Sequence, residues 1–249
     1  TTHSLNVVLE ADWHNILVLN KGADTLCKTP EELDKIRRSN PQALFAKKII
    51  CCEGRTEYGF MRAIDSLLCS RFHTTFSAYG VVLLESGGGD KMYSYARKLH
   101  ELGFDTCVFA DDDKSSDLKN AKSETIAAKI PLFLCEEGNC LEQQLFNDLS
   151  WECMPVIIKC DQEDFPKENI LLPAGLEERI SAAATEEAQT QIRNELASMS
   201  IVKNKEWFKH IPGGEFLGQV FGGAFDDMGS EVHSKKTICE LLKWCGVNV

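Results

Sequence analysis

Two segments of this chain place carboxylates directly after an apolar run. Lys48–Cys52 is followed by Glu53 and Glu57, and Thr106–Ala110 is followed by Asp111–Asp113. Short apolar runs that end on polar residues or glycine are typical of buried strands, so both acidic groups follow predicted strand ends. Clusters of oxygen ligands suit hard cations such as Mg²⁺ or Mn²⁺. The chemistry that these residues offer is therefore the binding of divalent metal ions.

The elements that must position these acids alternate between strand and helix. Apolar runs predict four strands, at Lys48–Cys52, Gly80–Leu84, Thr106–Ala110 and Ile130–Cys135. Helical spacing of apolar side chains predicts helices at Thr56–Phe72, Asp90–Leu102 and Gln143–Leu149, with a polar stretch at Lys114–Ala128. Such alternation favours βαβ units and a parallel sheet. The carboxyl ends of parallel strands share one edge, where open α/β sheets bind their ligands.

The rest of the chain gives weaker signals. We expect a strand at Asn15–Asn20 and a mixed, polar connector at Lys21–Ala46. After Trp151 the composition changes, and helices are predicted at Glu177–Met199, in a stretch beginning after Pro212 or Gly214, and at Thr237–Trp244. We expect these helices to pack on or beside the sheet.

Composition limits the class of protein. The chain has 249 residues, of which 43% are apolar and 26% charged, as in ordinary soluble domains. No apolar run approaches the roughly 20 residues that span a bilayer, and the start at Thr1–Ser4 lacks the basic and apolar regions of a signal peptide. We therefore expect a soluble, cytoplasmic protein with no membrane partner. The 11 cysteines include no Cys-x-x-Cys pair, and many lie inside apolar runs, which predicts buried, reduced thiols.

The ordered acidic motifs resemble a known family. Glu53-Gly54-Arg55-Thr56-Glu57 after one strand and Asp111-x-Asp113 after another resemble the Toprim domain of topoisomerases, primases and certain nucleases. Glu142, after the fourth strand, fits a further acidic position of the nuclease branch. Thr2-His3-Ser4 resembles the end of an ABC/SMC-type ATPase domain. The chain as a whole resembles the C-terminal region of an OLD-family (overcoming lysogenisation defect) nuclease, a type also used in Gabija antiphage systems.

This resemblance implies a fold and a division of the chain. The fold class would be α/β, with a Toprim-like, four-stranded parallel sheet flanked by helices and an appended helical C-terminal part. Residues 1–46 would be the end of an ATPase-like domain and a connector. Residues 47–160 would be the Toprim catalytic domain, and residues 161–249 the helical part packed on or beside it.

The resemblance also implies an activity. The chain would be a metal-dependent DNA endonuclease, the nuclease region of a larger ATPase-nuclease in phage defence or DNA repair. Two Mg²⁺ or Mn²⁺ ions, which in such sites lie roughly 3.5–4 Å apart, would act on the phosphodiester. The metal ligands would be Glu53, Glu57, Asp111, Asp113 and Glu142, with Glu53 also assisting proton transfer. The partners would be DNA, an upstream ATPase domain and a second copy or larger assembly.

Basic residues complete the set of candidates. Family nucleases use a lysine from the C-terminal region, for which position favours Lys209 over Lys205 and Lys203. Lys91, Arg97 and Lys205 are candidates for contacts with the DNA backbone, although Lys91 and Arg97 also suit a solvated helix face. The net charge of −11 opposes binding to nucleic acid, which usually rests on a basic surface.

Several alternatives remain open at this point. Glu57 could serve only to stabilise a helix start, Glu142 could merely begin a surface helix, and Thr56 could cap the helix that Glu57 enters. A non-catalytic Toprim module for partner docking or nucleotide sensing is the main alternative function. A receiver-type domain is a further one, although receivers carry their paired acids after the first strand. No arrangement of histidines and Ser86 supports a serine nucleophile. The strand-passing relatives of the family attack DNA with a tyrosine from another domain, and this sequence shows no sign of one, so water is the expected nucleophile.

Overall fold

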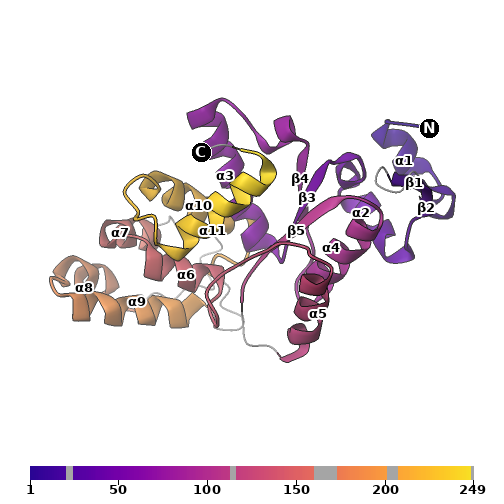
Figure 1. The fold of residues 1–249 in the computed structure, drawn as a ribbon. Helices are drawn as coiled ribbons and strands as arrows, with labels where there is room; N and C mark the ends of the chain where they lie inside the picture. Colours follow the sequence, from indigo (N-terminus) through magenta and orange to yellow (C-terminus); the bar gives the residue numbers. More distant parts are fainter. Residues whose placement is uncertain (21–24, 113–115, 160–172, 201–206, 248–249) are drawn as a thin grey trace.

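The computed structural model describes residues 1–20, 25–112, 116–159, 173–200 and 207–247 of the chain (Figure 1). The strands are β1 (Leu17–Asn20), β2 (Thr25–Lys28), β3 (Lys48–Cys52), β4 (Val81–Glu85), β5 (Asp105–Ala110) and β6 (Leu132–Leu134). The helices of the first part are α1 (Leu5–Glu10), α2 (Asp34–Ser39), α3 (Arg55–Phe72), α4 (Lys91–Glu101), α5 (Ser116–Ala127) and α6 (Leu141–Asp148). Those of the second part are α7 (Met154–Ile158), α8 (Leu176–Ala182), α9 (Glu186–Ser200), α10 (Ile211–Ala224) and α11 (His233–Cys245).

The main sheet has four parallel strands in the order β4-β3-β5-β6. The four strands follow one another in the sequence, and each is separated from the next by a helix, which is the βαβ arrangement that the alternation predicted. The predicted α/β class, with a four-stranded parallel sheet flanked by helices, is confirmed. All four carboxyl ends therefore lie along one edge of the sheet.

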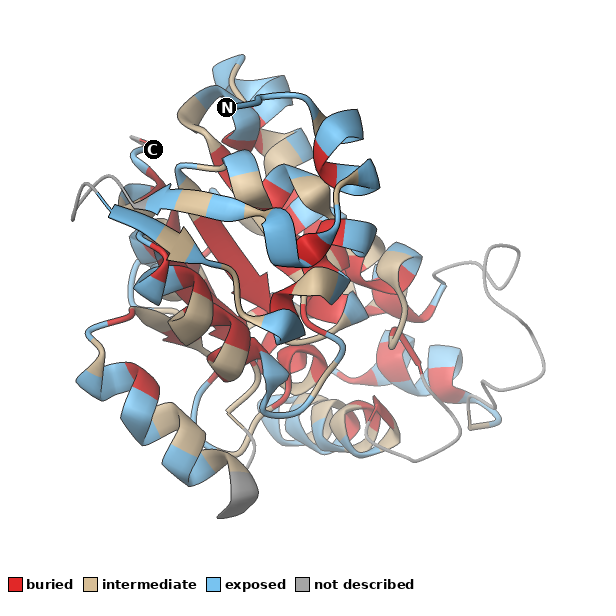
Figure 2. Cartoon of the chain, turned by 90° about the vertical axis from the view of Figure 1, so that its right-hand side faces the viewer, coloured by how far each residue is buried: buried red, intermediate tan, exposed pale blue. Residues whose placement is uncertain are grey.

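Helices cover both faces of the sheet, as a sheet with two apolar faces requires. Successive residues of β3 point to opposite sides, so that Ile50 and Cys52 pack in one core while Ile49 and Cys51 pack in the other. The first core includes residues of α3, α6 and the C-terminal helices, and the second includes residues of α2 and α4. Figure 1 shows these two groups of helices on either side of the strands, and Figure 2 shows the buried strands between them.

The appended helices join the first core through α10, which lies along α3. The two backbones come so close that only glycine fits at the crossing. A Cβ at Gly214 would lie 2.1 Å from the carbonyl oxygen of Thr56, and one at Gly59 would lie 2.1 Å from that of Ile211. One turn further on, a Cβ at Gly218 would lie 2.6 Å from the Cβ of Ala63. The start of α10 is thereby fixed against the start of α3.

The structure differs from the sequence predictions at several elements. The connector contains a strand, β2, which pairs antiparallel with β1, and the predicted strand at Asn15–Asn20 begins only at Leu17. The stretch predicted to be polar contains helix α5. The segment Glu177–Met199 is two helices rather than one, and α10 begins at Ile211, before the positions predicted for its start. These differences leave the four-stranded sheet unchanged.

The cysteines follow the prediction made from their apolar context. Cys51, Cys52, Cys107 and Cys135 are buried, and every cysteine within the described ranges is a free thiol. No helix among the described residues is long and apolar enough to cross a membrane.

Candidate metal and catalytic site

The sheet register brings Glu53 and Asp111 to one edge. Cys52 of β3 lies opposite Phe109 of β5. The N–H of Glu53 continues this ladder by donating to the carbonyl oxygen of Phe109 at 3.1 Å. Asp111 follows β5 directly, so the two acids leave neighbouring parallel strands at the same end. This is the edge at which open α/β sheets bind ligands.

A glycine loop lies beside Glu53. Gly87, Gly88 and Gly89 have φ values of 82°, 81° and 68°, a left-handed conformation that other residues rarely adopt. The N–H of Gly88 donates to the carbonyl oxygen of Glu53 at 2.8 Å. The loop after β4 therefore turns back onto the end of β3 and holds the backbone of Glu53 in place.

Glu57 enters the site from the first turn of α3. Its Oε2 accepts a hydrogen bond from the N–H of Gly54 at 2.9 Å, and the residue is only 4% exposed. A carboxylate at this position also favours the positive end of the helix. The capping role predicted for Thr56 is wrong, because Gly54 is the N-cap residue and the Thr56 hydroxyl instead donates to the carbonyl oxygen of Phe208 at 3.0 Å.

Asp111 and Glu142 meet at the first turn of α6. Oδ1 of Asp111 accepts a hydrogen bond from the N–H of Leu141, the first residue of that helix, at 2.7 Å. Glu142 is the next residue, and its side chain is 0% exposed. Glu142 therefore does not lie on a surface helix face, and the alternative that it merely begins a surface helix is wrong.

Lys209 reaches this group of acids from the appended helical part. Its Nζ lies 2.9 Å from Oε2 of Glu142 and 4.0 Å from Oδ2 of Asp111. The side chain of Lys209 is 31% exposed and that of Glu142 is 0% exposed, so the lysine lies between the buried carboxylate and solvent. Lys209 thus lies beside two of the predicted metal ligands, and its catalytic role stays a prediction.

Burial and mutual repulsion raise the pKa values of two of the acids. Desolvation is the main cause for Glu57, whose pKa lies above its usual 4.5, and the charge of Glu142 adds to it. The pKa of Asp111 lies well above its usual 3.8, chiefly because of burial and then because of Glu57. Burial by itself lowers the pKa of Lys209, but attraction to Glu142 and Asp111 outweighs it and the net shift is upward. Lys209 is therefore a cation at neutral pH.

One carboxylate oxygen of the acidic group lacks a hydrogen-bond donor among the described residues. Oε1 of Glu142 is buried and accepts no hydrogen bond from the described residues. A buried carboxylate oxygen without a donor is costly, and a cation would satisfy it. The all-oxygen chemistry of Glu53, Glu57, Asp111 and Glu142 fits Mg²⁺ or Mn²⁺. Within the described ranges, the structure contains no group of three or more His, Cys, Asp or Glu side chains that are close enough together to hold a metal ion.

Residues 44–113 match the family model described as "Overcoming lysogenization defect protein-like, TOPRIM domain". This chain carries an OLD-like Toprim domain. The family resemblance of the motifs at Glu53–Glu57 and Asp111–Asp113 is thus confirmed. No curated protein matches the chain. Among solved structures, the C-terminal region of the Burkholderia pseudomallei OLD protein has a TM-score of 0.49 at 14% sequence identity, with 80% of this chain and 98% of that chain covered.

Other predicted site residues lie apart from the acidic group or outside the described ranges. Asp113 and Lys205, like Lys203, fall outside the residues that the structure describes. Asp112 is half-buried, and its Oδ1 pairs with Nζ of Lys122 at 2.7 Å. The metal role of Asp113 and the DNA contact of Lys205 stay predictions.

Arg97 and Lys91 differ in their surroundings on α4. Arg97 donates to the carbonyl oxygen of Ala121 at 2.8 Å and pairs with Glu124 at 3.0 Å, so it joins α4 to α5. Lys91, at the first position of α4, is exposed. Of the two predicted DNA contacts, Lys91 is the better placed to meet a partner, and both stay predictions.

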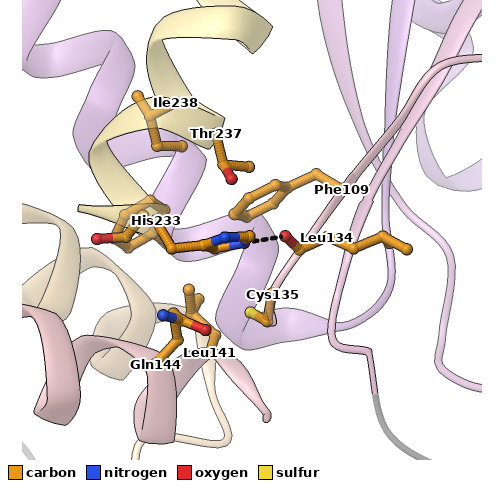
Figure 3. Close-up of a pocket in the computed structure, with 10 residues that line it drawn as sticks. Phe109, Leu134, Cys135, Leu141, Gln144, His233, Thr237 and Ile238 are labelled. Carbon is orange, nitrogen blue, oxygen red and sulfur yellow. Dashed lines mark hydrogen bonds between the residues drawn. The ribbon is translucent and has the colours of Figure 1, made fainter. Parts of the chain in front are cut away.

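A small pocket lies between the sheet and α11, and Leu141, which donates to Asp111, is one of its lining residues (Figure 3). Its walls are mainly apolar and include Phe109, Leu134 and Ile238. Nε2 of His233 lies 2.9 Å from the carbonyl oxygen of Leu134 and joins α11 to the end of β6. The cavity has a volume of about 10 Å³, which is room for about one water molecule, so it is no substrate site.

The residues that hold Lys209 beside the acids were not identified in the sequence analysis. Phe208 and the glycines of α10 attach the appended helices to α3, next to Glu57. One signal was present in the sequence, since Gly214, Gly218 and Gly222 recur at every fourth residue and predict a close helix crossing. The partner helix of that crossing could not be identified from the spacing.

Proposed function

We propose that this chain is a nuclease module that hydrolyses DNA phosphodiester bonds with the help of divalent metal ions. The observation that carries the proposal is the buried carboxylate of Glu142, which has one oxygen paired with Lys209 and the other without a donor among the described residues. Asp111 and Glu57 lie beside it with raised pKa values. Buried acids with raised pKa values at a ligand-binding edge are typical of functional sites.

The residues divide into metal ligands and groups that act on the substrate. Glu53, Glu57, Asp111 and Glu142 would hold the metal ions, with Asp113 as a further proposed ligand. When bound, Mg²⁺ or Mn²⁺ ions supply activation of a water molecule and stabilisation of charge on the phosphate. Glu53, at the end of β3 and partly exposed, would accept a proton from the attacking water at its carboxylate.

Lys209 would bind the phosphate of the substrate. Its pKa is raised by Glu142 and Asp111, so it keeps its proton at neutral pH. A fixed ammonium beside the acids can pair with a phosphate oxygen and offset the negative charge that develops there. Because the side chain is partly exposed, the ammonium can reach a ligand that arrives from solvent.

The acidic net charge of the chain opposes binding to DNA, so a partner has to supply basic contacts. At a net charge of −11, the chain lacks the basic surface that usually carries binding to DNA. We propose that an upstream ATPase domain of the full-length protein, or a second copy of the chain, supplies most contacts with the DNA backbone. Lys91 and Lys205 would add local contacts. A role in phage defence or DNA repair belongs to the same proposal.

The test is the nicking of supercoiled plasmid with Mg²⁺ or Mn²⁺. We expect metal-dependent nicking by the unmodified chain and a loss of about a hundredfold or more in Glu142→Gln and Asp111→Asn. Glu137→Gln is the matched control, because Glu137 is exposed on the loop before α6 and its replacement removes one charge near the site. Nicking that survives both site variants, or that does not occur with either metal, would favour the non-catalytic Toprim module instead.

A further inference from the structure

We infer that Thr56 is a positioning residue that holds Lys209 against the carboxylates, an inference that rests on the proposed function. Thr56 is 2% exposed, and its hydroxyl donates to the carbonyl oxygen of Phe208 at 3.0 Å. This hydrogen bond joins the first turn of α3 to the residue directly before Lys209. The same helical turn therefore carries Glu57 and the group that fixes the lysine.

The carbonyl of Phe208 is a fixed point in the segment before α10. It also accepts a hydrogen bond from the N–H of His210 at 2.7 Å, so a three-residue turn encloses Lys209. Phe208 has a φ of +66°, which is uncommon for a residue with a side chain, and its ring is fully buried against Trp207 at a centroid distance of 4.6 Å. A strained backbone of this kind persists only where its surroundings hold it.

The start of α10 holds the turn from the other side. Nδ1 of His210 accepts a hydrogen bond from the N–H of Gly213 at 2.9 Å and caps the helix. Gly214 then lies against the carbonyl oxygen of Thr56 itself. Thr56 thus contacts both ends of the segment that carries Lys209, through its hydroxyl and through its backbone.

The functional consequence is a direct link between helix α3 and the lysine. If the hydroxyl is removed, the glycine contacts still keep α10 on α3, but the turn around Lys209 loses the hydrogen bond that joins it to the side chain of Thr56. The ammonium would then leave its place beside Glu142 for part of the time. Displacement of a catalytic group by about 1 Å costs up to about a hundredfold in rate.

The first test compares Thr56→Val with Thr56→Ser, alone and in a Lys209→Ala background. Valine keeps the volume and removes the hydrogen bond, whereas serine keeps the hydroxyl. We expect plasmid nicking to fall about tenfold or more in Thr56→Val, to be largely restored in Thr56→Ser, and to fall no further when Thr56→Val is added to Lys209→Ala. An equal loss in both backgrounds would overturn the inference.

Thr106→Val is the matched control for a purely structural effect. The Thr106 hydroxyl is also buried and donates to a backbone carbonyl, that of Ala96, at 3.0 Å, but it lies at the amino end of β5. We expect a similar loss of stability and no change in nicking. A comparable loss of nicking in this control would show that the Thr56 effect is general destabilisation.

A second readout does not depend on activity. The rate at which an amine reagent labels Lys209, followed by mass spectrometry, should be slow in the unmodified chain and in Thr56→Ser, and several-fold faster in Thr56→Val. Labelling of the exposed Lys91 should be the same in all three. If the chain fails to nick DNA while Lys209 labelling responds to Thr56→Val, the proposed function fails and the positioning role stands. Unchanged labelling would overturn the positioning role by itself.

Discussion

Nζ of Lys209 lies 2.9 Å from Oε2 of Glu142, a carboxylate with no exposed surface. The pair joins residues 67 positions apart and ties the appended helices to the first turn of α6. It also places the ammonium of Lys209 close to Asp111 as well as to Glu142. The stability and the metal response of the chain should therefore depend on this lysine.

Lys209→Met should destabilise the metal-free chain. The change leaves Glu142 and Asp111 without their cation, at a cost of about 2 kcal/mol once the partial exposure of the lysine is taken into account. Added Mn²⁺ should then raise the thermal midpoint more in the variant than in the unmodified chain, because the metal replaces the missing charge. Differential scanning fluorimetry measures both effects, with the exposed Lys91→Met as control. Equal metal shifts in the two chains would contradict a shared site.

The pH dependence of stability should report the raised pKa of Asp111. An acid whose pKa is higher in the folded state stabilises the fold fully below its unfolded value of 3.8, and this contribution is lost as the pH rises through the folded pKa. In metal-free buffer, Asp111→Asn should therefore be more stable than the unmodified chain at pH 7, with a smaller difference near pH 4. Urea unfolding at several pH values measures this, with Asp112→Asn as control. Parallel curves for all three chains would show that Asp111 is not perturbed.

Metal binding should release protons and strengthen with pH. Glu57 and Asp111 have raised pKa values, so part of their population is protonated in mildly acidic solution and must lose its protons before it can bind a cation. We expect Mn²⁺ to bind at least several-fold more tightly at pH 8 than at pH 6. Calorimetric titration in buffers of different ionisation enthalpy counts the released protons. Binding that is independent of both pH and buffer would place the metal elsewhere.

The crossing of α3 and α10 should tolerate no side chain at Gly214. A Cβ there would lie 2.1 Å from the carbonyl oxygen of Thr56, so the backbones must separate. Gly214→Ala should cost about 3 kcal/mol or prevent folding, as overpacking of a tight contact does. Gly223→Ala on the same helix meets no atom within 4 Å and should be neutral or stabilising by up to about 1 kcal/mol. Denaturant unfolding compares the two, and similar values would contradict the close crossing.

The sequence by itself determined the sheet and most of the acidic group. Alternation of apolar runs and helical spacing is a local signal, and it predicted four parallel strands and the acids that follow Lys48–Cys52 and Thr106–Ala110. The same signal failed at β2, whose side chains are largely exposed, and at α5, whose apolar residues are not gathered on one face. Elements without a clear apolar period give no pattern to detect.

Only the tertiary structure decided how Lys209 joins the acids and what holds it there. Thr56 and Phe208 are separated by 152 positions, and their hydrogen bond depends on the close approach of two glycine-lined helices. The sequence contains the repeating glycines of α10, but the choice of α3 as partner follows from packing between distant segments. The raised pKa values of Glu57 and Asp111 have the same origin, because burial and neighbouring charge belong to the folded chain rather than to any motif.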